Sequence, residues 1–308
     1  MAVYKPEGRM PAHAEDAAQW TELDLQRAMI QGTILEGRAI LCDKDHNLLV
    51  QVGGFTGFMP RKEAAMGIRE GTAREIAIIS RVNKPVAFRI IDIARDGQDV
   101  VPILSRAQVQ EECLSYCLSH LSPGDVTEAR VTHLEPFGAF VDIGCGVTSL
   151  ITIDNISISR IAHPADRFAV GQGILAVVKE IDFDLRRISL SHKELLGTWE
   201  ENAALFTPGQ TVSGIIRSVE SYGVFVELTP NLTGLAEWQE GLCVGETAVV
   251  YIKSMQKERM KIKLLIADHF PTRTPPPPLR YFTDAAHISR WRYSPEGCER
   301  VVETLFDA

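Results

Sequence analysis

Short stretches in which hydrophobic and polar residues alternate recur along most of the chain and predict β-strands. A period of two turns one face of a strand toward a core and the other toward solvent. Between residues 32 and 106 we also interpret short apolar-rich stretches as strands, at 37–41, 47–52, 75–79, 86–91 and 101–104, with glycine-containing turns among them. Five short strands of this kind are typical of a small closed barrel.

Helical spacing is confined to segments that precede or connect the strand-rich parts. Residues 14–31 are rich in helix formers with one apolar side, and Gly32 is the expected stop signal. Residues 105–121 and 191–205 also have helical spacing. We therefore expect these helices to separate compact β-rich repeats.

One strand-rich segment occurs twice. Pro-Phe-Gly-Ala-Phe-Val-Asp-Ile at 136–143 returns as Ser-Tyr-Gly-Val-Phe-Val-Glu-Leu at 221–228, an offset of 85 residues. The closing strands match at an offset of 74, so the later copy lacks 11 residues between matched strands. An internal repeat fixes the architecture. We expect the extra residues to form a surface loop, because surface loops tolerate insertions.

The predicted fold is an all-β repeat protein of three tandem five-stranded barrels, the first degenerate and without an aromatic pair. The expected segments are an N-terminal arm and helix (1–31), the degenerate repeat (32–106), a helical linker (107–120), repeat two (121–193), a second helical linker (194–204), repeat three (205–268) and a proline-rich linker with an aromatic and arginine-bearing tail (269–308). Arg290, Trp291, Arg292 and Tyr293 alternate cation and ring. Such a tail either stacks on bases or folds back onto repeat three, and we favour the second.

Composition places the chain among soluble globular proteins, with 45% hydrophobic and 23% charged residues. No apolar run has the length of a membrane span, and the N-terminus lacks the build of a secretory signal, so we expect a cytoplasmic protein. The formal net charge of −8 argues against simple electrostatic adhesion to nucleic acid. It leaves base stacking open, because stacking needs aromatic faces and only a few local cations.

Metal and catalytic motifs are weak. Cys113, Cys117 and His120 share one helical face, which suits either a three-ligand metal site or, as we prefer, a buried face that uses cysteine as a small apolar residue. Asp182 and Asp184 are better explained as a solvated hairpin tip than as a metal pair. The chain has no Walker loop, no His-Glu-x-x-His and no Gly-x-Ser-x-Gly. We therefore expect neither an enzyme nor a cofactor.

The aromatic pairs carry the chemistry. Phe137 and Phe140 lie three residues apart, as do Tyr222 and Phe225 in the later copy. A bulge or a turn at Gly138 would bring both rings of the first pair outward. Stacking contributes about 1–3 kcal/mol per base and is tolerant of sequence. The alternative is that both rings are core, but Ala139 and Val141 already supply an inward face.

The motifs Pro-Gly-Asp, Phe-Gly-Ala-Phe-Val-Asp-Ile-Gly, Val-Gly-Gln and Arg-Arg-Ile-Ser-Leu-Ser resemble the RNA-binding domain of the bacterial ribosomal protein S1 family. The match is close over 121–193, good over 206–265 and weak over 32–106, and the whole chain resembles the short form of Firmicutes. This resemblance implies OB-folds that bind single-stranded RNA. It assigns RNA contacts to Phe137, Phe140, Thr152, Asp184 and Arg187 in repeat two and to Tyr222, Phe225, Glu237 and Lys261 in repeat three.

Two positions depart from the family pattern, because Thr152 and Glu237 stand where the family has histidine. Glu237 repels phosphate, so we expect repeat two to bind RNA more tightly than repeat three. His133 is a candidate replacement for the missing imidazole. Further candidate cations are Arg130, Lys179, Arg186 and Lys193 in repeat two and Arg217, Lys253, Lys257, Arg259 and Lys263 in repeat three.

The resemblance predicts a protein that binds single-stranded messenger RNA and assists translation on the small ribosomal subunit, with no membrane and no small-molecule substrate. Repeat one is then a protein-binding module or a spacer. The alternative function is a protein-binding scaffold, or an RNA-regulatory factor that is not stably bound to the ribosome.

Overall fold

The computed structural model describes residues 4–9, 20–271 and 278–306. The chain divides into two compact units. Unit one contains Met1–His120 with Glu128–Arg130 and Asp142–Thr148, and unit two contains Leu121–Thr127, Val131–Val141 and Ser149–Ala308. None of the helices among the described residues has the length and hydropathy needed to cross a membrane.

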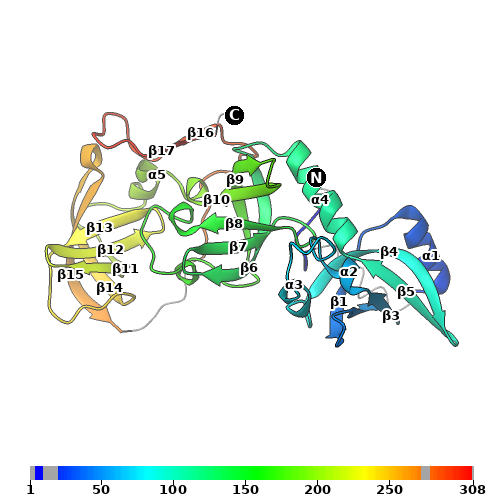
Figure 1. The fold of residues 1–308 in the computed structure, drawn as a ribbon. Helices are drawn as coiled ribbons and strands as arrows, with labels where there is room; N and C mark the ends of the chain where they lie inside the picture. The colour runs from blue at the N-terminus through cyan, green and yellow to red at the C-terminus, as the bar shows by residue number, and fades with distance from the viewer. Residues whose placement is uncertain (1–3, 10–19, 272–277, 307–308) are drawn as a thin grey trace. The chain divides into compact units, whose positions relative to one another are not determined.

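Repeat one, in unit one, is a closed five-stranded barrel with the strand order β1-β2-β3-β5-β4 (Figure 1). Its strands are β1 (Leu35–Cys42), β2 (Leu48–Val52), β3 (Phe55–Met59), β4 (Pro85–Asp96) and β5 (Asp99–Ser105). Its helices are α1 (Glu22–Gln31), α2 (Arg61–Ala64), α3 (Ile76–Ile79) and α4 (Ala107–His120).

The predicted strand at 75–79 is wrong, because these residues form the short helix α3. Ile78 is fully buried while Ile76 and Ile79 are exposed. A run of apolar residues without alternation does not distinguish a strand from a helix. The expected stop at Gly32 is confirmed, because Gly32 ends α1 in the left-handed conformation with φ of 60°.

Unit two contains two further closed barrels (Figure 1). Repeat two consists of β6 (Val126–Glu135), β7 (Gly138–Asp142), β8 (Thr148–Thr152), β9 (Gly173–Asp182) and β10 (Arg187–Ser191). Repeat three consists of β11 (Thr211–Glu220), β12 (Gly223–Thr229), β13 (Leu232–Ala236), β14 (Thr247–Gln256) and β15 (Lys261–Phe270). In every barrel the third strand pairs in parallel with the fifth. The three tandem barrels of the prediction are therefore confirmed.

The connection between these two barrels is not one continuous helix over 191–205. It contains a 3-10 turn at Lys193–Leu196 and the short helix α5 at Trp199–Ala203. Gly197, with φ of 82°, interrupts the helical conformation between them. Thr198 then caps α5 by accepting a hydrogen bond from the backbone N–H of Glu201.

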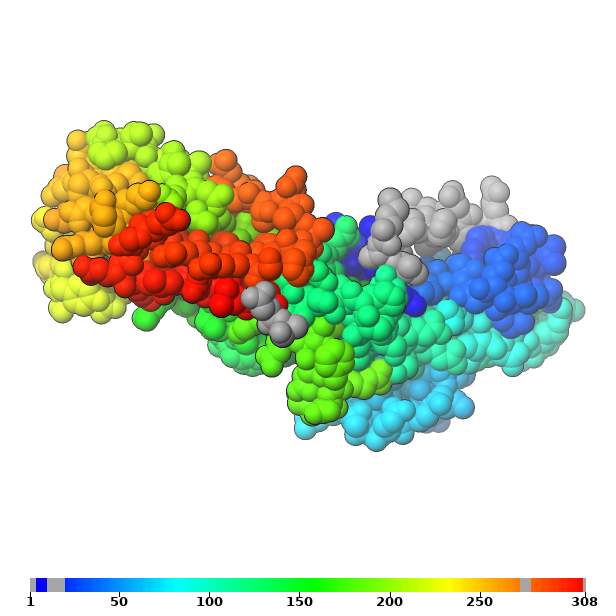
Figure 2. Space-filling view, turned by 90° about the horizontal axis from the view of Figure 1, so that it is seen from above, coloured from blue at the N-terminus to red at the C-terminus, as the bar shows by residue number. Residues whose placement is uncertain are grey.

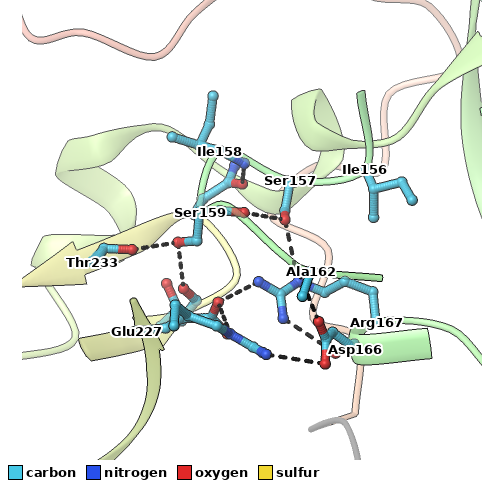
Figure 3. Close-up of polar contacts among 12 residues, drawn as sticks. Ile156, Ser157, Ile158, Ser159, Ala162, Asp166, Arg167, Glu227 and Thr233 are labelled. Carbon is cyan, nitrogen blue, oxygen red and sulfur yellow. Dashed lines mark hydrogen bonds and ion pairs between the residues drawn. The ribbon is translucent and has the colours of Figure 1, made fainter. Parts of the chain in front are cut away.

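The extra residues of repeat two do not form a free surface loop, and in this respect the prediction is wrong. Figure 3 shows that they contact repeat three. The Ile158 N–H donates to Asn231 Oδ1 at 2.9 Å, and the Ser159 and Thr233 hydroxyls are 2.7 Å apart. Arg167 forms a buried ion pair with Glu227. The insertion is therefore part of the interface between the two barrels.

The tail folds onto unit two. Of the two alternatives for the tail, folding back onto repeat three therefore holds for its two central rings. Trp291 and Tyr293 are 7% and 6% exposed and belong to the core cluster of repeat three. The Tyr293 hydroxyl donates to the carbonyl oxygen of Asn231 at 2.5 Å. Strands β16 (Arg290–Arg292) and β17 (Glu303–Leu305) pair in this segment, which Figure 2 shows in orange-red to red along the surface of unit two. The proline-rich stretch before Pro278 lies outside the described residues.

The predicted face of Cys113, Cys117 and His120 lies on α4. Both thiols are buried, whereas His120 is exposed and its ring stacks on Tyr116 with centroids 4.1 Å apart. Contact with Cys117 and Cys145, together with burial, raises the pKa of Cys113. The three side chains therefore do not converge, and within the described ranges no group of three or more ligating side chains is arranged for a metal ion.

Candidate nucleic-acid interface

The aromatic pair of repeat two lies at the start of β7. Phe137 is in the turn before this strand and 54% exposed, and Phe140 is half-buried. Their ring centroids are 5.8 Å apart, with the planes at 89°. Ala139 and Val141 are fully buried and fill the inward face. Because Phe137 lies in the turn before the strand, alternation does not constrain it, and both rings lie off the core.

Gly138 allows this geometry through close packing of β7 on β8. A Cβ atom at this position would lie 2.4 Å from the carbonyl oxygen of Ile151. Any larger residue would push the two strands apart. The Phe-Gly-x-Phe spacing therefore combines a tight strand contact with two rings on the outer side.

His133 extends the aromatic surface of repeat two. Its ring centroid is 6.3 Å from that of Phe140, and the two planes differ by only 25°. His133 Nε2 lies 2.7 Å from Glu135 Oε1, so the ring is held at its outer edge. Rings of His133, Phe140 and Phe137 thus form one cluster on the outside of the barrel.

The fifth strand of repeat two supplies the cation. Ser189 on β10 pairs in parallel with Leu150 on β8, and exposed Arg187 lies two residues earlier on the same face. Thr152 ends β8 and is half-buried, and its hydroxyl accepts a hydrogen bond from Asn155 Nδ2 at 2.8 Å. The same hydroxyl bonds the carboxylate of Asp154 and lowers its pKa. The Thr152 hydroxyl therefore already has hydrogen-bond partners in Asp154 and Asn155 of the following turn.

Asp184 lies in the exposed turn between β9 and β10. Asp182 at the base of this turn accepts a hydrogen bond from the backbone N–H of Leu185 at 2.8 Å. Phe183 and Leu185 are 67% and 62% exposed in the same turn. The solvated hairpin tip expected from the sequence is confirmed, and it also carries two apolar side chains.

Repeat three reproduces the geometry of the ring pair. Tyr222 is 69% exposed, and its centroid is 6.2 Å from that of Phe225 with the planes at 84°. Across the sheet, Phe225 pairs with Leu235, and Leu235 pairs with Lys263. Lys261 lies two residues before Lys263 on the same face of β15. On the fifth strand of repeat three, Lys261 and Lys263 therefore occupy the positions that Arg187 and Ser189 occupy in repeat two.

Glu237 does not stand as an isolated negative charge. It follows β13, is exposed, and forms an ion pair with Lys253 at 3.3 Å. Lys253 therefore places a cation beside the carboxylate that the sequence predicts to repel phosphate. Trp238, the next residue, is 53% exposed. The repeat comparison missed this ring because the matched residue of repeat two is Ile153.

Three candidate cations contact other groups of the protein, and the buried one, Arg217, cannot reach the RNA backbone. The Arg217 side chain is buried and bonds Glu227 and Asp166, with Nη1 3.3 Å from Asp166 Oδ1. Arg130 donates to the carbonyl oxygen of Glu7 at 2.5 Å. Lys257 forms an ion pair with Glu200 near α5. Arg187, Lys261 and Lys263 are exposed on the fifth strands of repeats two and three.

An exposed aromatic pair beside a cationic strand, on a closed five-stranded barrel that recurs, defines a nucleic-acid-binding OB-fold module. Residues 121–193 match the S1 RNA binding domain family. The second repeat therefore carries an S1 RNA binding domain, and part of the chain is similar to bacterial S1 proteins.

The curated relatives agree with this assignment. The chain is 34% identical over 194 residues to the small ribosomal subunit protein bS1 of Leuconostoc lactis, which covers 61% of this chain and 43% of the relative. It is 35% identical over 156 residues to the bS1 homolog of Bacillus subtilis (strain 168), covering 49% and 40%. These alignments thus span less than half of the relatives' length.

Among solved structures, the chain is similar to a multidomain protein with nucleic acid binding domains from Streptococcus pneumoniae TIGR4. The TM-score is 0.25 and the sequence identity 16%, with 77% of this chain and 74% of the other covered.

Proposed function

We propose that the chain binds single-stranded RNA, in particular messenger RNA, through the ring-bearing faces of repeats two and three. The observation that carries the proposal is the matched pair geometry, with Phe137 and Phe140 at 5.8 Å and Tyr222 and Phe225 at 6.2 Å. One ring of each pair is more than half exposed. Exposed rings offer stacking partners to unpaired bases, which a duplex keeps stacked on each other.

The charge distribution favours stacking with only local phosphate contacts. The net charge is −8, so a large phosphate footprint does not fit the chain. Arg187, Lys261 and Lys263 are nevertheless exposed on the fifth strand of their barrels, where each offers one cation to a backbone phosphate. The expected binding is tolerant of base sequence and only weakly dependent on salt.

The proposed setting is translation in the cytoplasm. The relatives that match are named as proteins of the small ribosomal subunit, and residues 121–193 of this chain match the S1 RNA binding domain family. We infer that the chain brings unstructured message to the small subunit. Co-sedimentation of the chain with purified small subunits, with and without added oligonucleotide, tests this part separately from RNA binding.

A protein-binding scaffold is the second candidate, and one observation favours it. Phe183 and Leu185 are exposed at the β9–β10 turn, where Asp182 and Asp184 flank Phe183. Two apolar side chains in such a place fit a protein surface better than RNA.

The deciding experiment is a fluorescence anisotropy titration of the full chain. The probes are a labelled 20-nucleotide unstructured RNA and the same RNA annealed to its complement. We expect saturable binding of the single strand and at least tenfold weaker binding of the duplex. Equal affinity for both, or no binding of either, contradicts the proposal. The protein-binding scaffold is then the remaining candidate function.

A further inference from the structure

We propose that unit two holds a binding site for an aliphatic carboxylic acid, in a cavity lined by repeat three, the connection around α5 and the tail. The cavity has a volume of about 480 Å³. Sites for small molecules typically measure about 300–1,000 Å³. Tyr222 and Phe225 do not line this cavity, so the inference goes beyond RNA binding and does not depend on it.

The walls of the cavity are mainly aliphatic. Leu196 and Leu205 come from the connection around α5, Ile215 and Leu228 come from β11 and β12, and Pro278 comes from the tail. Leu196 is buried, Ile215 and Leu228 are half-buried, and Leu205 and Pro278 are exposed. The apolar lining therefore extends from the interior of the unit to its surface, as an elongated apolar ligand requires.

The polar groups at the inner part of the lining already have partners. The buried carboxylate of Glu227 is paired with two arginines. The Asn202 amide is also satisfied, because Nδ2 donates to the carbonyl oxygen of Leu196 at 2.8 Å and Oδ1 accepts from the Thr229 hydroxyl at 2.6 Å. These groups offer little to a polar ligand, so the inner part of the cavity favours an apolar chain.

Arg280 supplies a positive charge at the exposed side of the cavity. Apart from Glu227, it is the charged residue of the lining, and its side chain is exposed. Among the described residues, its guanidinium contacts the ring of Phe282, 5.0 Å from the centroid, and has no carboxylate partner. An unpaired cation at the edge of an apolar cavity fits a ligand with one negative group at the end of an apolar body.

The aromatic ring of the lining is not open for base stacking. The Arg280 guanidinium covers a face of Phe282. Gly197 approaches the same ring so closely that a Cβ atom there would lie 2.7 Å from Phe282 Cγ. Stacking of a base requires an open ring face. The cavity therefore suits an aliphatic acid better than a nucleotide, although both carry a negative group.

Isothermal titration calorimetry of the full chain with sodium decanoate, sodium octanoate and guanosine monophosphate tests the ligand class. We expect one decanoate site per chain and binding of octanoate that is weaker by about tenfold or more, since each buried methylene contributes roughly fourfold in affinity. Guanosine monophosphate is expected not to displace decanoate. Equal affinity for the two acids, or displacement by the nucleotide, overturns the inference.

Two variants locate the site. Leu205→Trp fills part of the cavity and is expected to weaken decanoate binding by about tenfold or more. Arg280→Gln removes the cation and is expected to weaken it by about threefold to fivefold, because an exposed ion pair contributes little. Arg290→Gln is the matched control, since this exposed arginine of the tail pairs with Glu303 and does not line the cavity.

Wild-type affinity for decanoate in either cavity variant overturns the inference. Arg280 is exposed, so its variant decides the question even where Leu205→Trp fails to fold. The anisotropy titration with RNA is expected to be unchanged in both variants. Failure of this inference therefore leaves the proposed function standing, and absence of RNA binding leaves this inference standing.

Discussion

Arg167 of repeat two and Glu227 of repeat three form an ion pair in which both side chains are almost completely buried, at 1% and 2% exposure. The same Glu227 carboxylate accepts hydrogen bonds from Arg217 at 2.8 and 3.2 Å. Asp166 provides a second carboxylate 3.3 Å from Arg217 (Figure 3). Two buried guanidinium groups therefore depend on Glu227, which makes this residue the centre of the interface between the barrels.

Replacing Glu227 by glutamine is expected to destabilise unit two by about 3–5 kcal/mol, because it leaves buried positive charge uncompensated. Urea denaturation monitored by circular dichroism measures the change. Glu200→Gln is the matched control, since it removes the exposed pair with Lys257. The control is expected to change stability by less than about 1 kcal/mol. Equal effects of the two substitutions contradict the view that Glu227 holds the interface.

His192 predicts acid sensitivity of unit two. Its Nδ1 donates to the carbonyl oxygen of Ile156 at 3.1 Å, and its Nε2 is 3.4 Å from the Tyr281 hydroxyl. Burial lowers the pKa of this histidine from 6.5 to about 4. Between these values the unfolded chain binds more protons than the folded one. The stabilisation is therefore complete above pH 6.5 and is lost as the pH falls through 4.

The loss at low pH is expected to reach about 3 kcal/mol. Thermal or urea unfolding of the wild type and of His192→Gln between pH 4 and 7 measures it. The variant is less stable at neutral pH, but its stability changes less with pH over this interval. His120→Gln, which alters an exposed histidine, is expected to keep the wild-type slope. If the stability of the wild type and of His192→Gln depends on pH in the same way, His192 is not the source of the acid sensitivity.

Deletion of residues 279–308 is expected to lower stability and to leave RNA affinity unchanged. The deletion removes Trp291, Tyr293 and Phe306, which are all buried, and each such side chain contributes about 1.5–3 kcal/mol. Scanning calorimetry and the anisotropy titration are run on the same samples. If the truncated chain does not fold, Tyr293→Phe serves instead, with an expected loss of about 1 kcal/mol from its hydrogen bond to Asn231. Reduced affinity at unchanged stability would instead assign the tail to RNA.

The barrels and the ring pairs are predictable from the sequence because both depend on local pattern. Alternation and the internal repeat define the strands, and the glycine between two aromatics marks the close strand contact at Gly138. The helix α3 was missed because four adjacent apolar residues carry no period. The correct predictions and the missed helix therefore both follow from local sequence pattern, which was the only information used.

Other features depend on what a segment meets in the folded protein. Arg217 resembles a surface cation in sequence and is buried only because Asp166 and Glu227 surround it. The burial of Ser159 likewise follows from its contact with Thr233 of the next repeat. The sequence pattern of a single repeat therefore does not show which of its residues contact the next repeat.

The central claim is that exposed rings, rather than net charge, bind the RNA, and the most direct measurement is the affinity of Phe137→Ala combined with Tyr222→Ala. Both rings are more than half exposed, so we expect the melting temperature to stay within a few degrees of the wild type. Affinity for unstructured RNA is expected to fall by about 1–3 kcal/mol for each stacked base that is lost. Leu190→Ala, a substitution in the core of repeat two, is the control and shows the reverse, with lower stability and unchanged affinity of the folded protein. Unchanged affinity with a large fall in melting temperature for the ring variant would contradict the account, because the rings would then belong to the core.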